Sequence, residues 1–151
     1  MRTTIRQAVT AALLAAGTAA GSRVHESPYN ARKAFPALVV EGAGARWTEG
    51  VTEIQEARTM PAGAQRPVKR LYRFAVVAEV QDGTDYAAAR DTLAGQAEAC
   101  VAALQITGVA QIVPVAYQDA DDNTAGKPIR QGVQIYEALY FTTQGDPTTP
   151  R

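Results

Sequence analysis

The side chains that could support catalysis in this sequence are few and lie far apart. His25 is its only histidine and Cys100 its only cysteine. A lone histidine beside a turn, with no neighbouring cysteine or second histidine, does not complete a metal site. Cys100 falls within the apolar stripe of a predicted helix over 86–105, where a buried thiol is normally inert. We therefore expect His25 to be a surface or edge residue and Cys100 a small core residue.

An acidic segment provides the one pattern that resembles a metal loop. Oxygen ligands stand at 119, 121 and 123, the alternate positions with which a calcium loop begins. Thr124 replaces the turn glycine, however, and Arg130 occupies the place of the bidentate glutamate. The pattern predicts a solvated hairpin turn, with weak divalent binding at a subunit contact as the alternative. We find no spacing typical of acid–base catalysis and no cofactor motif, so we predict that the chain is not an enzyme and binds no cofactor.

Composition limits the classes of protein to which the chain can belong. Its 151 residues are 46% hydrophobic, which predicts a single folded domain over 1–143. The last residues, 144–151, offer nothing to bury and are predicted to be a disordered tail. Fifteen basic residues balance fifteen acidic ones, so no net field attracts nucleic acid or an anionic membrane. No apolar run approaches the roughly 18 residues of a membrane-spanning helix, and the lone cysteine is compatible with the cytoplasm.

The N-terminal segment superficially resembles a signal peptide, because arginines precede an alanine-rich stretch. Its larger apolar residues nevertheless recur at helical spacing, at Ile5, Val9 and Leu13. Thr3 or Thr4 can cap such a helix and Gly17 can end it. We predict a retained amphipathic helix, and the alternative is a cleaved signal peptide.

Six further segments read as strands, at 23–25, 35–42, 46–58, 68–80, 111–117 and 129–142. Pro114 predicts an edge or bulged position for the fifth of them. The irregular stretch from Thr59 to Pro67 predicts a protruding loop between two antiparallel strands, either floppy or ordered against a partner. Together with the two helices, these strands predict an α+β fold: a two-layer sandwich of a mostly antiparallel or mixed sheet with both helices on one face.

Alternation of residue types along the two longest predicted strands indicates which of their faces are buried. In the strand over 68–80, Tyr72, Phe74 and Val76 share one face, which we assign to the core, and the other face to water or a partner. In the last strand we assign Val133, Ile135, Leu139 and Phe141 to the core, so that Tyr136 and Tyr140 point outward. With Leu71 and Val77 they form a predicted tyrosine-rich patch, which implies association.

The order of these elements resembles a known family. The features that carry the likeness are the helix that opens at Arg2, the strand from Phe35 to Val40, the glycine-broken turn into Trp47, the acidic turn, and the aromatic strand that ends at Phe141. Taken together, residues 2 to 143 resemble the tail terminator proteins of long-tailed phages, the lambda-like minor tail protein U group.

The resemblance implies a structural virion protein without catalysis. Members of this family form a hexameric ring on the head-proximal end of the tail tube, stop tube polymerisation and offer a docking surface to the head connector. The implied partners are further copies of the chain, the tail tube protein and the connector, with DNA passing through the lumen without specific binding. The implied location is the virion, assembled in the host cytoplasm, with no membrane contact. We expect the following interface residues: Trp47, Glu49, Met60, Arg66, Lys69, Arg73, Tyr136 and Tyr140.

Two other functions are compatible with the sequence. A head-completion or neck protein of the same phage would dock on the portal side of the joint. A small secreted α+β ligand-binding domain is favoured if the first twenty or so residues are cleaved.

Overall fold

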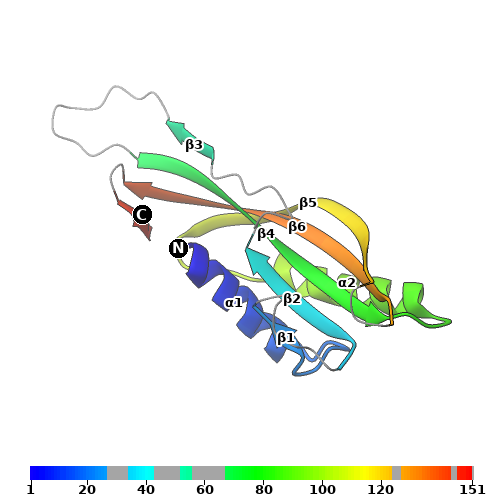
Figure 1. Cartoon of the computed structure of the whole chain (residues 1–151). Coiled ribbons are helices and arrows are strands. Elements are labelled where there is room, and N and C mark those ends of the chain that lie inside the picture. The colour runs from blue at the N-terminus through cyan, green and yellow to red at the C-terminus, as the bar shows by residue number, and fades with distance from the viewer. Residues whose placement is uncertain (27–33, 43–51, 56–66, 124–126, 144–145, 151) are drawn as a thin grey trace, which may run out of the picture.

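The computed structural model describes residues 1–26, 34–42, 52–55, 67–123, 127–143 and 146–150. In chain order the elements are α1 (Arg2–Ala15), β1 (Val24–His25), β2 (Ala37–Gly42), β3 (Thr52–Gln55), β4 (Pro67–Gln81), α2 (Tyr86–Ala102), β5 (Val109–Asp122), β6 (Ile129–Thr143) and β7 (Asp146–Pro150). The predicted α+β class is confirmed, and so are both helices and five of the predicted strands (Figure 1). Of the strand predicted over 46–58, the structure describes only Thr52–Gln55, which form β3. The loop predicted at 59–67 lies outside the described residues up to Pro67, where β4 begins.

Two long strands form the centre of the sheet. β4 and β6 pair antiparallel along their whole length, from Pro67 opposite Thr143 to Gln81 opposite Ile129. The other side of each long strand pairs with two shorter strands that follow one another along it. β2 and β3 lie along β4 in this way, and β5 and β7 lie along β6. β1 adds to β2 in parallel, which makes a mixed sheet of seven strands.

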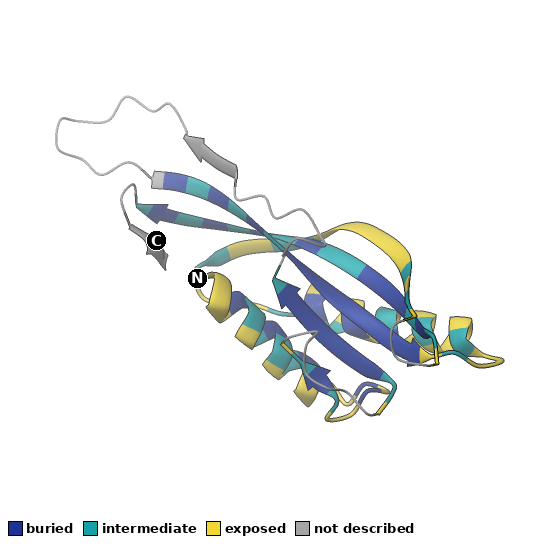
Figure 2. Ribbon diagram, viewed as in Figure 1, coloured by how far each residue is buried: buried dark blue, intermediate teal, exposed yellow. Residues whose placement is uncertain are grey.

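Both helices pack against the same face of this sheet. The spacing of Ile5, Val9 and Leu13 predicted the buried face of α1, and all three side chains are fully buried. α2 buries Leu93, Ala97 and Val101, which belong to the predicted stripe. These residues join alternate residues of β2, β4 and β6 in one core, so hydrophobic burial holds helices and sheet together (Figures 1 and 2).

The ends of α1 are set by backbone geometry. Gly17 follows the C-cap residue Ala16 with a φ of 63°, the left-handed conformation that glycine adopts without a Cβ penalty, as predicted. At the other end, the helix begins at Arg2 with Met1 as the N-cap. Thr3 and Thr4 therefore lie inside the first turn, and the prediction that one of them caps the helix is wrong.

The face of the sheet that points away from the helices is also buried at its centre. Val39, Val77 and Val133 are at most 1% exposed and pack together there. Beside them the Gln131 amide donates a 2.9 Å hydrogen bond to the Glu79 carboxylate, which is 1% exposed. The expectation that this face of β4 meets water or a partner is therefore wrong for its central part.

The C-terminal residues differ from the sequence-based prediction. We predicted a disordered tail over 144–151, but Asp146–Pro150 form β7, which pairs antiparallel with the end of β6. Composition misled this prediction because a strand at a sheet edge is held by main-chain hydrogen bonds, which require no apolar side chains. The prediction from Pro114 is confirmed: β5 is an edge strand and its register shifts between Pro114 and Ala116.

A glycine at the end of β2 makes room for a polar contact across the core. A Cβ added to Gly42 would lie 2.6 Å from the Arg6 Nη1 atom and 3.0 Å from the Tyr72 hydroxyl, and these two groups form a 2.7 Å hydrogen bond. Gly42→Ala is expected to displace the Arg6 guanidinium and to lower the free energy of unfolding by about 1.5 kcal/mol, measured in urea. Gly83→Ala, where an added Cβ meets nothing within 4 Å, is the matched control. Equal stability of the two variants would contradict this role for Gly42.

Candidate interaction surface

Two of the predicted interface residues lie on β4, on the face opposite the helices. Arg73 is directly across from Glu137 of β6, and its guanidinium donates a 2.5 Å hydrogen bond to that carboxylate. Lys69 is half-buried on the same face, nearer the start of the strand. Arg73 of β4 and Glu137 of β6 therefore form a cross-strand ion pair. The other predicted residues outside the tyrosine pair, Trp47, Glu49, Met60 and Arg66, lie outside the described residues.

The predicted tyrosine patch is wrong. Tyr136 and Tyr140 are 1% and 2% exposed and belong to the core beneath the helices. The strand register explains this, because Tyr136 lies opposite Phe74, and directly opposed residues of neighbouring strands share a face. The two rings stack with centroids 5.3 Å apart and planes 16° apart. Neither tyrosine is available to a partner in the folded chain.

The residues first considered for chemistry have structural neighbours. His25 lies in β1 opposite Val39, at the sheet edge as predicted. Cys100 is half-buried beside the core, and burial raises the pKa of its thiol. The partial burial of Cys100 and its raised pKa favour a role in packing over a role as a nucleophile.

The acidic segment is mostly strand, where a turn was predicted. Asp119 and Asp121 lie in β5, and their carboxylates are 3.2 Å from Arg90 and 2.6 Å from Arg130 respectively. Within the described residues, no three His, Cys, Asp or Glu side chains form a group that could hold a metal ion. Two of the three oxygen ligands of the apparent calcium pattern, Asp119 and Asp121, are thus paired with arginines.

Arg130 connects three segments at one end of the sheet. Besides Asp121, it contacts Asp82 at 3.3 Å in the turn before α2, and its guanidinium carbon lies 5.1 Å from the centre of the Tyr86 ring. Hydrogen bonding to Asp82, together with Asp121, raises the pKa of Arg130. These contacts are of the kind that holds a turn against a sheet and do not form a reaction centre.

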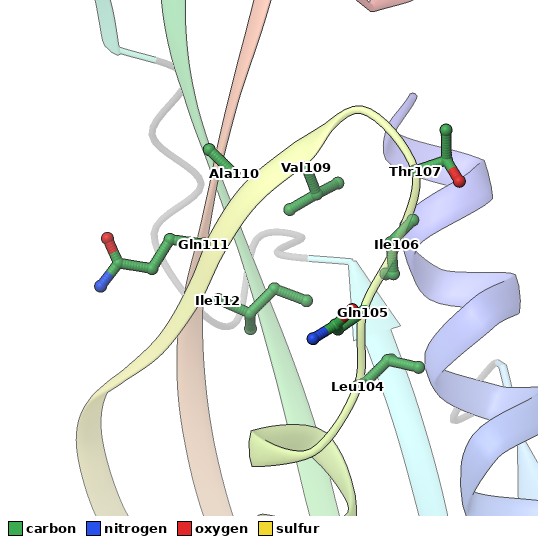
Figure 3. Close-up of a pocket in the computed structure, with 8 residues that line it drawn as sticks. All are labelled: Leu104, Gln105, Ile106, Thr107, Val109, Ala110, Gln111 and Ile112. Atoms are coloured by element: carbon green, nitrogen blue, oxygen red, sulfur yellow. The ribbon is translucent and has the colours of Figure 1, made fainter.

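A hollow of about 560 Å³ lies where the chain leaves α2 and enters β5. Figure 3 shows Leu104, Ile106, Val109 and Ile112 around this space, with Thr107 and Gln111 directed away from it. Its lining contains no charged side chain. Without a nucleophile or an acid–base pair among these residues, it offers no catalytic chemistry.

The outer edge of β5 is the most exposed part of the sheet among the described residues, as the colours of Figure 2 show. Every residue from Pro114 to Asp119 is exposed, including Val115 at 44% and Tyr117 at 46%. Burial on its inner side raises the pKa of Tyr117, and the neighbouring Arg90 guanidinium opposes this shift. We had not predicted this edge as an interface, although Pro114 signalled an edge and Val115 and Tyr117 alternate along it.

Because Gly132 of β6 has no side chain, side chains of β5 and α2 can pack directly against its backbone. A Cβ at this position would lie 2.5 Å from the Tyr117 hydroxyl and 3.2 Å from Cγ of Arg90. The Tyr117 ring and the Arg90 side chain therefore lie directly against the backbone of β6. This packing supports the exposed stretch of β5 from one side, and no strand in the described part of the chain pairs with its outer edge.

None of the described helices is long and apolar enough to cross a membrane. No family model matches the chain and no curated protein matches it. Among solved structures, the chain is similar to one described as "Virion of native gene transfer agent (GTA) particle", with a TM-score of 0.52 and 13% sequence identity. The likeness covers 91% of this chain and 95% of that chain. At this identity it shows a shared fold.

Proposed function

We propose that this chain is a non-enzymatic structural protein of a phage or phage-like virion, and that it forms a ring on the head-proximal end of the tail tube. In this role it stops tube polymerisation and offers the head connector a docking surface. The observation that carries the proposal is the likeness to the gene transfer agent chain, because it extends over nearly the whole of both chains. A fold hosts many functions, so the sequence resemblance to tail terminators supplies the specific role.

The properties of the surface are compatible with such a ring. The chain carries equal numbers of acidic and basic residues, so a lumen built from it has no strong net attraction for the DNA that passes through. The exposed apolar side chains on β5 are of the kind that protein contacts bury. A ring of six copies of this 16.0 kDa chain has a mass of about 96 kDa.

Deletion of the gene from the particle that encodes it tests the role directly. Without a terminator, tube subunits keep adding, so we expect overlong tails that carry no heads, measured by electron microscopy. A plasmid copy of the gene should restore normal length. Normal-length tails beside unattached heads would instead identify a head-completion or neck protein. Unchanged particles would overturn a virion role and would favour a secreted ligand-binding domain.

A further inference from the structure

A second hollow, of about 500 Å³, lies between the middle of α2 and the exposed stretch of β5. On the helix it is lined by Asp91, Gly95 and Glu98, which share one side of α2 because they are spaced by four and three residues. On the sheet it is lined by Tyr117 and Asp119, which alternate along β5. We call it the Gly95 hollow. Its volume is within the range of known ligand sites.

Gly95 keeps this hollow open. It lies in the interior of α2, where glycine is the least favourable residue after proline. Packing within the described chain does not require it, because a Cβ added at this position meets no atom within 4 Å. Gly132 differs in this respect, since a Cβ there would lie 2.5 Å from the Tyr117 hydroxyl. The missing side chain at Gly95 therefore leaves room for a group from outside the chain.

The Gly95 hollow has more negative than positive charge. Arg90 is the only basic residue that lines it among the described residues, and its guanidinium is shared between the carboxylates of Asp91, at 3.0 Å, and Asp119, at 3.2 Å. Glu98 adds a third carboxylate and is exposed. One guanidinium beside three carboxylates leaves an excess of two negative charges at neutral pH. A cation is therefore the complementary occupant, even after the ion pairs within the chain are counted.

The lining favours an organic cation over a metal ion. No three His, Cys, Asp or Glu side chains in the described ranges form a group that could hold a metal ion. Tyr117, which is 46% exposed, instead offers the face of an aromatic ring, to which guanidinium and ammonium groups are attracted. A guanidinium can stack on such a ring and donate paired hydrogen bonds to a carboxylate, which an ammonium cannot do. Arginine is thus the best match.

We propose that the Gly95 hollow binds an arginine side chain of another protein chain. The carboxylates around the hollow accept hydrogen bonds from the guanidinium, and the Tyr117 ring is the surface on which it stacks. Val115, which is 44% exposed on the same stretch of β5, adds apolar contact with the partner. The inference goes beyond the proposed ring: it concerns the chemistry of one contact, so it can stand or fail apart from the proposed function.

A capped arginine is the simplest probe of this site. Isotope-labelled wild-type protein is titrated with N-acetyl-arginine amide and, as the matched control, with N-acetyl-citrulline amide, which has nearly the same shape and no charge. We expect saturable shifts of the Gly95 and Tyr117 amide signals with the arginine compound, and binding of the citrulline compound that is weaker by about tenfold or more. No saturable shift, or equal binding of the two compounds, overturns the inference. A butylammonium ion that binds as tightly overturns the assignment of arginine.

Filling the hollow tests the same site with a change that does not threaten the fold. Gly95→Leu places a side chain in open space and improves helix propensity, so its urea midpoint should equal or exceed that of the wild type. We expect it to weaken binding of the capped arginine by about tenfold or more. Thr92→Leu, exposed on α2 outside the lining, should leave binding unchanged. Equal binding by Gly95→Leu and wild type overturns the inference, while the tail-length test of the proposed function is read separately.

Discussion

Replacing Val40 with aspartate is expected to unfold the chain. The Val40 side chain is fully buried in β2, in the core that the two helices cover. The substitution removes its apolar contacts and places a carboxylate in the core without a designed partner, at a cost on the order of 5 kcal/mol. That is comparable to the whole stability of a typical domain. Circular dichroism and urea titration should show loss of the cooperative transition at 25 °C.

The matched control for this change is Val115→Asp on β5. Val115 is 44% exposed, so its carboxylate stays in water and the free energy of unfolding should change by less than about 0.5 kcal/mol. If Val40→Asp instead yields soluble, folded monomer, then β2 is not a core strand and its burial belongs to an interface between subunits.

Truncating Tyr136 to alanine is expected to cost about 3–5 kcal/mol of the free energy of unfolding. Its ring is 1% exposed and stacks on Phe74, whose ring in turn stacks on Tyr72 with centroids 6.0 Å apart. Removing the Tyr136 ring leaves a cavity that the close-packed side chains around it cannot easily fill. A loss below about 1 kcal/mol in urea would restore the original prediction that this tyrosine points outward.

Removing only the hydroxyl separates packing from hydrogen bonding. The Tyr136 hydroxyl is buried and has no hydrogen-bond partner among the described residues, so Tyr136→Phe should leave the stability unchanged or raise it by up to about 1 kcal/mol. Tyr72→Phe should be destabilising by about 1.5–3 kcal/mol, because the Arg6 guanidinium loses its 2.7 Å acceptor. Equal effects of the two substitutions would contradict this assignment of partners.

The wild-type protein and Tyr136→Phe are also predicted to differ in stability at alkaline pH. Burial raises the pKa of Tyr136 well above its ordinary value. The folded state thus favours the neutral phenol, and its contribution is complete below the unfolded pKa of about 10 and declines as the pH rises further. Wild-type stability should fall above about pH 10 more steeply than that of Tyr136→Phe.

The burial of Tyr136 and Tyr140 removes them from the residues that a partner could contact, whereas Val115 and Tyr117 of β5 are exposed. The hollow beside Ile112 lies near the start of β5, while the acidic residues Asp119, Asp121 and Asp122 lie near its end.

Local patterns were sufficient for much of the fold. The spacing of Ile5, Val9 and Leu13 determined the buried side of α1, since a helix places every fourth residue on one face. Alternation in β4 placed Tyr72, Phe74 and Val76 on one face, and all three lie in the core under the helices. Pro114 marked an edge strand because it cannot donate a ladder hydrogen bond.

Tertiary structure alone decided which way β6 faces and that Asp146–Pro150 form a strand. Both sides of β6 are rich in large residues, aliphatic at Val133 and Ile135 and aromatic at Tyr136 and Tyr140, so alternation separates two faces without saying which meets the helices. Pairing with β4 settles it, because Tyr136 opposite Phe74 must share its face. Likewise β7 exists because β6 offers a free main-chain edge, a feature that no local composition encodes.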